Sequence, residues 1–164
     1  MKYAAIDIGT NAARLLIGEL IEDKGQSSVK KITYLRIPLR LGDDVFEDGK
    51  ISNTKLEMFI KTISIFSLLA QIYDVKNIRA VATSAMRIAE NSKNVIAEIN
   101  TQTGVKIEVI SGDEEAKLLK NFVDVPAGHQ EWPAKTRDFW ASLSLKVPFE
   151  GAELEIGTYE DGNP

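Results

Sequence analysis

The sequence contains no cysteine and a single histidine, His129. The absence of cysteine excludes disulfides, thiol chemistry and cysteine-based metal sites, and one histidine cannot build a multi-histidine metal site. No apolar run reaches the roughly 18 residues of a membrane span, and no basic segment precedes a long apolar one at the N-terminus. The net charge of −4 gives no bulk attraction for nucleic acid. We therefore expect a cytoplasmic protein that binds neither membranes nor nucleic acid polymers.

Charge is distributed unevenly along the chain. Residues 1–120 carry 17 Lys and Arg against 16 Asp and Glu, whereas residues 121–164 carry 3 against 8. Both tryptophans, the histidine and four of the five prolines also lie beyond residue 121. This break in composition predicts one domain over 1–120, followed by an atypical acidic tail that either packs on it or extends into another chain.

Hydrophobic periodicity predicts three strands, followed by helices that alternate with further strands. We expect Ser52 or Asn53 to cap the long helix, Asn91 or Ser92 to cap a later one, and Gly104 to end that later helix. This order predicts an α/β fold, whose mixed sheet combines an antiparallel three-strand meander with crossover helices. The expected elements are strands near 3–8, 15–17 and 31–41, a turn at 23–28, a loop at 41–50, a helix at 54–73, a strand at 77–82, helices at 85–90 and 93–101, a strand at 105–110 and a helix at 113–120.

The first chemically suggestive stretch is the connection from Asp7 to Asn11, between two apolar runs. A turn with Gly9 at its apex directs several backbone N–H groups toward one point, and Thr10 and Asn11 add side-chain donors beside the Asp7 carboxylate. That combination suits a phosphate and a divalent cation. The alternative is an ordinary hairpin turn, which has the same residue types.

Two further polar clusters follow predicted strands, where open α/β sheets place their ligands. Thr83, Ser84 and Arg87 follow the strand at 77–82, and an arginine there can grip a phosphate with two parallel hydrogen bonds. Glu114 and Glu115 follow the next strand, where a carboxylate can activate a water for attack on phosphorus. The alternatives are a helix cap with a surface arginine, and acids that merely suit a helix N-terminus.

An acidic segment, the loop at 41–50, has two possible interpretations. This loop is rich in Asp and Gly, so its acids either bind a cation or form a solvated turn, and the solvated turn is favoured.

In the tail, we expect a short helix at 136–143 and a hairpin at 145–159, with aromatic residues covering an apolar face. The segment Glu155–Thr158 repeats the pattern of the first turn with Glu for Asp, and His129 is expected in a solvated loop.

Three clusters in this order resemble the exopolyphosphatase and guanosine pentaphosphate phosphatase family. The matching segments are 7–16, 82–87 and 110–116, and the stretch at 41–51 is also similar, so the resemblance covers about residues 1–120. It implies an actin-like, ribonuclease-H-like domain that forms one of two lobes around a phosphate chain. It also implies hydrolysis of a terminal phosphoanhydride of inorganic polyphosphate or guanosine pentaphosphate with Mg²⁺.

The resemblance also implies roles for individual residues. Asp7 would help to hold the metal ion, and Gly9, Thr10 and Asn11 would form the first phosphate loop. Near the cleft, Arg87, Thr83 and Ser84 would bind phosphate. The general base would be Glu115, with Glu114 as its neighbour.

The chain departs from the family pattern after residue 120. It lacks the second phosphate loop of the form Asp-x-Gly-Gly-Gly-Ser and resembles a single lobe. A second hypothesis is therefore a single-lobe remnant that binds phosphate compounds or a partner without turnover, and a homodimer is compatible with either hypothesis. A third is a relative of sugar or acetate kinases, which share the Asp-x-Gly-Thr opening, although the other two clusters argue against it. Polyphosphate and guanosine pentaphosphate are both compatible with the sequence.

Overall fold

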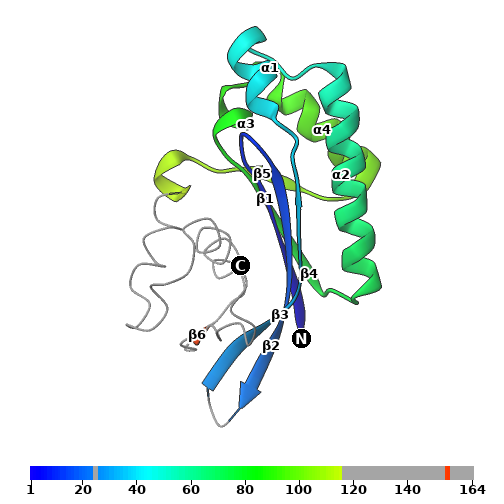
Figure 1. Cartoon of the computed structure of the whole chain (residues 1–164), viewed down its shortest axis with the longest axis vertical. Helices are drawn as coiled ribbons and strands as arrows, with labels where there is room; N and C mark the ends of the chain where they lie inside the picture. Colours follow the sequence, from blue (N-terminus) through cyan, green and yellow to red (C-terminus); the bar gives the residue numbers. More distant parts are fainter. Residues whose placement is uncertain (24–25, 116–153, 156–164) are drawn as a thin grey trace.

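The computed structural model describes residues 1–23, 26–115 and 154–155, which form a mixed sheet with helices on one face (Figure 1). The elements in chain order are β1 (Lys2–Ile8), β2 (Ala13–Asp23), β3 (Gln26–Ile37), α1 (Leu41–Asp48), α2 (Asn53–Ile72), β4 (Asn77–Ala82), α3 (Ser84–Ile88), α4 (Ser92–Thr103), β5 (Ile107–Val109) and β6 (Leu154–Glu155). The strand order in the sheet is β5-β4-β1-β2-β3-β6.

The predicted antiparallel meander is confirmed. β1 pairs antiparallel with β2, which pairs antiparallel with β3 through a register shift between Ile17 and Gly18. The expected turn at 23–28 is shorter than predicted, because Asp23 already pairs with Gln26. β3 ends at Ile37 rather than at residue 41, since Pro38 has no N–H to donate to the ladder.

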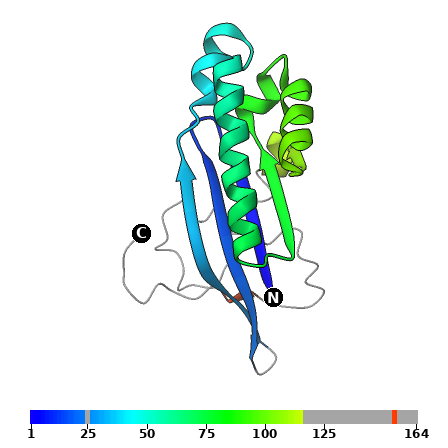
Figure 2. The same cartoon turned by 90° about the vertical axis from the view of Figure 1, so that its right-hand side faces the viewer.

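The crossover helices are also confirmed. β4 lies parallel to β1, and β5 lies parallel to β4. Figure 2 shows α2 running along one face of the sheet, with α4 beside it. The inner side of α2 presents Phe59, Ile63 and Phe66, which are completely buried and belong to one core cluster with Ile6 and Leu15 of the sheet. This spacing along α2 is the helical period that the sequence predicts.

The loop expected at 41–50 is instead the helix α1, so that prediction is wrong. Leu41 and Val45 lie one turn apart and are both buried, and this packing outweighs the turn-forming composition of the segment. Asp43 and Asp44 occupy the first turn, where carboxylates suit the helix dipole. Gly49 ends α1 in the left-handed conformation, with φ of 72°.

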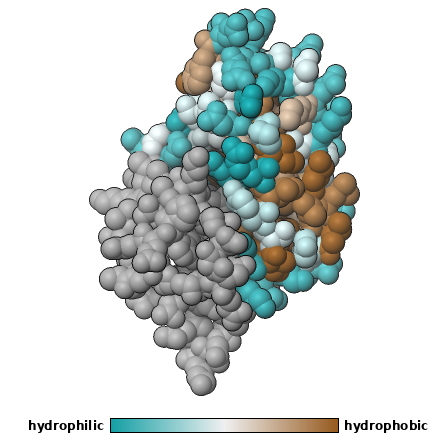
Figure 3. Space-filling view, viewed as in Figure 1, coloured by the Kyte–Doolittle hydropathy of each residue, from teal (hydrophilic) through white to brown (hydrophobic). Residues whose placement is uncertain are grey.

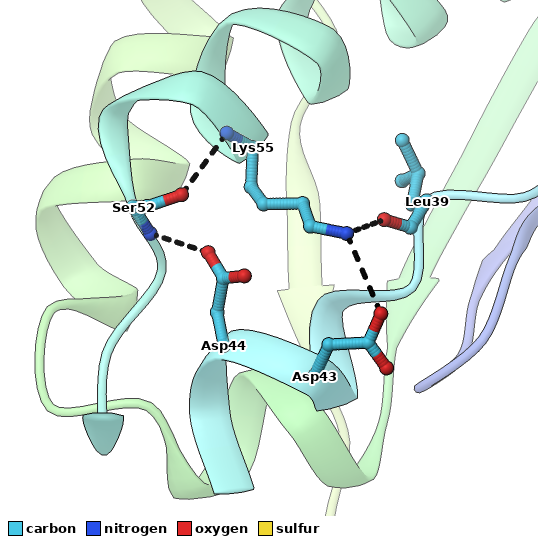
Figure 4. A network of polar contacts seen from close by, with 5 residues as sticks. All are labelled: Leu39, Asp43, Asp44, Ser52 and Lys55. Carbon is cyan, nitrogen blue, oxygen red and sulfur yellow. Dashed lines mark hydrogen bonds and ion pairs between the residues drawn. The ribbon is translucent and has the colours of Figure 1, made fainter. Parts of the chain in front are cut away.

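A polar network joins α1 to the start of α2 (Figure 4). The Ser52 side chain caps α2 by accepting a hydrogen bond from the Lys55 amide at 3.3 Å, which confirms one of the two predicted caps. The Ser52 amide donates to the Asp44 carboxylate at 2.9 Å. The Lys55 ammonium donates to the Leu39 carbonyl at 3.0 Å and lies 3.8 Å from the Asp43 carboxylate. These contacts hold α1 against both α2 and the segment that follows β3.

The remaining helix ends agree only in part with the caps that the sequence predicts. Asn91 takes the N-cap position of α4, but its side chain does not cap the helix. The Asn91 side chain instead accepts a hydrogen bond from the Ile51 amide at 3.0 Å and donates one to the Ile51 carbonyl at 2.8 Å. These two bonds connect α4 to the segment before α2. Gly104 ends α4 in the left-handed conformation, as predicted. α3 and β5 form at the expected places, and β5 is shorter than the predicted strand at 105–110.

Several predictions concern residues that the structure does not describe. Residues 112–115 are helical, and the rest of the helix expected at 113–120 lies outside the described residues. The same holds for the domain boundary near residue 121, the helix at 136–143, His129 and the aromatic residues of the tail. Of the hairpin at 145–159 only β6 is described, and it pairs in parallel with Ser27 and Ser28 of β3.

The outer side of α2 is partly apolar. Met58, Ile65, Leu68 and Ile72 are exposed there, and Figure 3 shows hydrophobic surface gathered on the helical side of the molecule. Within the described residues, no helix is long and apolar enough to cross a membrane.

Candidate active site

Three parallel strands end level with one another. Ile8 of β1 pairs with Ala82 of β4, which pairs with Val109 of β5, so the three predicted clusters begin at one edge of the sheet. Two hydrogen bonds extend the alignment beyond the strands. The Thr83 amide donates to the Ile8 carbonyl, and the Ile110 amide donates to the Ala82 carbonyl, both at 3.1 Å. This edge is where ligands bind in open α/β sheets.

The turn between β1 and β2 is held by its carbonyl groups. The Gly9 amide donates to the Ala12 carbonyl at 3.0 Å, the Arg40 amide to the Asn11 carbonyl at 2.9 Å, and the Gly42 amide to the Thr10 carbonyl at 3.0 Å. Within the described part of the chain, the amides of Thr10, Asn11 and Ala12 donate no hydrogen bond. A turn with bonded carbonyls and available amides is suited to an anion.

Gly42 allows α1 to approach this turn. A Cβ atom at position 42 would lie 2.3 Å from Cγ2 of Thr10 and 3.0 Å from Cε2 of Phe46. A larger residue at position 42 would therefore force Thr10 or the start of α1 to shift, whereas glycine lets the α1 amide approach the Thr10 carbonyl without that shift. The sequence analysis did not identify Gly42 as important, because the glycine is needed only for a contact with a residue 32 positions earlier in the chain.

We expect Gly42→Ala to lower the free energy of unfolding by about 1–3 kcal/mol, because the new methyl group must displace Thr10 or the start of α1. Chemical denaturation of the two proteins measures the difference. The control is Gly112→Ala, since a Cβ at that position meets nothing within 4 Å. Equal stability of Gly42→Ala and the wild type would show that the turn does not depend on this close approach.

Asp7 and Arg14 form an ion pair across β1 and β2. Nη1 of Arg14 lies 2.5 Å from Oδ2 of Asp7, and their side chains are only 16% and 13% exposed. The two residues are register partners, equally far from the turn. The sequence alone suggests this pair only through the antiparallel register around Thr10 and Asn11, which places Arg14 opposite Asp7.

The structure brings Arg87 and Glu115 together. Nη1 of Arg87 donates to Oε2 of Glu115 at 2.9 Å and to the Ile110 carbonyl at 3.0 Å. Glu114 has a different partner, since its carboxylate lies 3.6 Å from the Arg79 guanidinium. The two adjacent acids are therefore directed toward different arginines, and only Glu115 contacts Arg87, which follows the end of β4.

Thr83 and Ser84 lie at the start of α3. Thr83 is buried and takes the N-cap position, but its side chain makes no capping hydrogen bond. The helix-cap alternative is therefore confirmed for the position of this threonine but not for its hydroxyl group. Its hydroxyl bonds to no other group among the described residues, while its amide joins β4 to the end of β1. Ser84 is partly buried as the first residue of α3.

The described residues offer little for a metal ion by themselves. They contain no group of three or more acidic, histidine or cysteine side chains that could hold one. Asp7 supplies one carboxylate near the end of β1, and that carboxylate also pairs with Arg14. Mg²⁺ commonly takes one or two protein carboxylates, together with substrate phosphates and water. This donor set therefore fits a magnesium ion that is shared with a bound phosphate.

Proteins of similar sequence identify the family of this chain. The model of the Ppx/GppA phosphatase family matches residues 20–124. This chain belongs to the Ppx/GppA phosphatase family. It is 29% identical to exopolyphosphatase 1 of Mycobacterium tuberculosis over 164 residues, which is 100% of this chain and 44% of that protein. It is 36% identical to a bifunctional 3-dehydroquinate synthase/phosphatase of Fusobacterium nucleatum over 118 residues, which is 70% of this chain and 18% of that protein.

Solved structures of the Ppx/GppA family share the fold. The Aquifex aeolicus family member matches with a TM-score of 0.69 and 26% identity, over 77% of this chain and 41% of that one. An exopolyphosphatase from Cytophaga hutchinsonii matches with a TM-score of 0.69 and 25% identity, over 78% of this chain and 40% of that one. The predicted family and the actin-like α/β architecture are therefore confirmed. The chain spans less than half the length of these relatives.

Proposed function

We propose that this chain hydrolyses the terminal phosphoanhydride bond of inorganic polyphosphate or guanosine pentaphosphate. One observation carries the proposal: the turn at 9–12, Arg87 and Glu115 all follow strands that end level at one edge of the sheet. Available amides, a guanidinium and a carboxylate are the groups that binding and hydrolysing a terminal phosphate require. Membership of a phosphatase family supports this proposal over the kinase alternative.

In the proposed reaction, the amides of Thr10, Asn11 and Ala12 bind oxygens of the terminal phosphate. The Glu115 carboxylate takes a proton from a water molecule as the water oxygen forms a bond to phosphorus. The bond from phosphorus to the bridging oxygen breaks, and the products are inorganic phosphate and a chain that is one phosphate shorter. Mg²⁺, held by Asp7 and the substrate, would neutralise charge that develops on the phosphate oxygens.

Arg87 has two parts in this proposal. Its guanidinium carries five N–H donors, so the contact with Glu115 leaves others for a phosphate oxygen. A single cation that contacts both the base and the phosphate keeps the water between them in position for attack. Because the Arg87 and Glu115 side chains are 29% and 35% exposed, water can reach the pair.

The test is to incubate the purified chain with long-chain polyphosphate, or with guanosine pentaphosphate, and to measure released phosphate. We expect release that requires Mg²⁺. If the chain binds either compound in calorimetry but releases no phosphate, hydrolysis is wrong and the alternative of binding without turnover is correct. If the chain neither binds nor hydrolyses them, both hypotheses are wrong.

A further inference from the structure

Asn11 and Asp43 line two separate depressions. The first has a volume of about 330 Å³ and the second a volume of about 490 Å³. The first is lined by Thr10, Asn11, Gly42, Asp43, Phe46 and Glu47. The second, here called the arginine depression, is lined by Asn11, Arg36, Pro38, Arg40 and Asp43. The arginine depression therefore adjoins the turn that is proposed to bind the terminal phosphate.

We propose that the arginine depression is a second anion subsite, which binds phosphate groups of the polyphosphate chain beyond the one that is cleaved. This inference rests on the proposed function, because Asn11 belongs both to the phosphate-binding turn and to this depression. A chain whose terminal phosphate occupies the turn would pass Asn11 and continue between Arg36 and Arg40.

The first supporting observation is the charge of Arg36. Its register partner on β2 is Arg14, and like charges that face each other across two strands are destabilising. Arg14 has the Asp7 carboxylate as its partner, but Arg36 forms no ion pair within the described residues. Arg36 is also exposed. A bound anion would relieve the repulsion between these two arginines.

The second observation is the backbone at Arg40. It adopts the left-handed conformation, with φ of 51° and ψ of 47°. That conformation costs a residue with a Cβ atom roughly 1–2 kcal/mol. The Arg40 amide donates to the Asn11 carbonyl at 2.9 Å, so the strained backbone is attached directly to the phosphate-binding turn. The Arg40 side chain is exposed and forms no ion pair with any described carboxylate.

The charges of the two depressions decide which one a polyanion enters. The described lining of the first carries two carboxylates, those of Asp43 and Glu47, and no basic side chain. The arginine depression carries two guanidinium groups and one carboxylate, and Lys55 lies 3.8 Å from that carboxylate, which belongs to Asp43. None of the described residues that line it is an aromatic residue on which a nucleobase could stack. Its lining therefore favours a phosphate chain over a base.

The experiment measures binding by the full chain of long-chain polyphosphate and of inorganic orthophosphate, at several salt concentrations. We compare the wild type, Arg36→Gln, Arg40→Gln and the control Lys76→Gln. The control removes one exposed positive charge at the start of β4, at the opposite end of this strand from the site. Each arginine variant should bind the long chain about 5- to 10-fold more weakly, while Lys76→Gln should bind it like the wild type.

Two further readouts separate direct binding from a structural effect. The slope of log Kd against log salt should fall by about 1 for each arginine removed, since each contact with a polyanion releases counterions. Orthophosphate binding should stay unchanged in every variant, because a single phosphate group occupies only the turn. Denaturation confirms that each variant is folded.

The possible results lead to different conclusions. If the arginine variants match Lys76→Gln in affinity and salt slope, the proposal of a second anion subsite is wrong. Phosphate release by the wild type would still support the proposed function in that case. An equal loss of orthophosphate and long-chain affinity would also overturn the subsite, because the arginines would then act on the turn itself. If the wild type binds neither compound, the proposed function is wrong and the subsite with it.

Discussion

Replacing Glu115 by glutamine should lower the rate of phosphate release from polyphosphate by about 10²–10⁴-fold, which is the usual contribution of a general base. Glutamine keeps an oxygen that can accept the hydrogen bond from Arg87, but it cannot take a proton from water. The dissociation constant for polyphosphate should therefore change little. Phosphate release at saturating substrate, together with binding calorimetry, measures the two effects separately.

The neighbouring acid provides the matched control. Glu114→Gln removes the same charge one residue away, but Glu114 is directed toward Arg79 rather than Arg87. We expect this variant to retain activity within a few-fold of the wild type. If Glu114→Gln loses more activity than Glu115→Gln, the assignment of the two acids must be exchanged. If neither variant changes the rate, the base lies elsewhere in the protein.

The second large effect is expected at the ion pair between β1 and β2. Asp7→Asn should lower the free energy of unfolding by about 3 kcal/mol, because it leaves the mostly buried Arg14 guanidinium without its carboxylate partner. The Nε atom of Arg14 is already buried and has no hydrogen-bond partner among the described residues, so the arginine depends on Asp7 for compensation. Urea denaturation measures the change.

Two variants define this effect further. Adding Arg14→Met to Asp7→Asn should recover part of the lost stability, since no unpaired buried charge then remains. The surface pair of Glu57 and Lys61 is the control, because its side chains are 73% and 77% exposed. Glu57→Gln should change stability by less than about 0.5 kcal/mol. If Asp7→Asn is no more destabilising than Glu57→Gln, the buried pair is not a stabilising element of the hairpin.

The sequence alone predicts the parts of this protein that depend on local chemistry. The apolar run of β1, the helical period of α2, the Ser52 cap and the terminal Gly104 all follow from preferences of neighbouring residues. The order of strands and helices then predicts the meander and the parallel crossovers, because few topologies satisfy it. The three polar clusters were also identifiable, since their residue types follow predicted strands.

Only the tertiary structure shows which residues of these clusters meet. α1 forms because Leu41 and Val45 are buried in the core, and an Asp- and Gly-rich composition does not reveal that burial. The contact of Arg87 with Glu115 joins residues 28 positions apart, so it depends on the level ends of β4 and β5.

The contacts around the turn between β1 and β2 also depend on long-range packing. The close approach of Gly42 to Thr10 and the position of Arg36 opposite Arg14 both require the register of β2 and β3. By itself, the sequence determined which elements form and which residue types end the strands, since short-range preferences decide both. The tertiary structure decided which charges are paired and which arginines form no ion pair within the described residues, because long-range packing brings those side chains together.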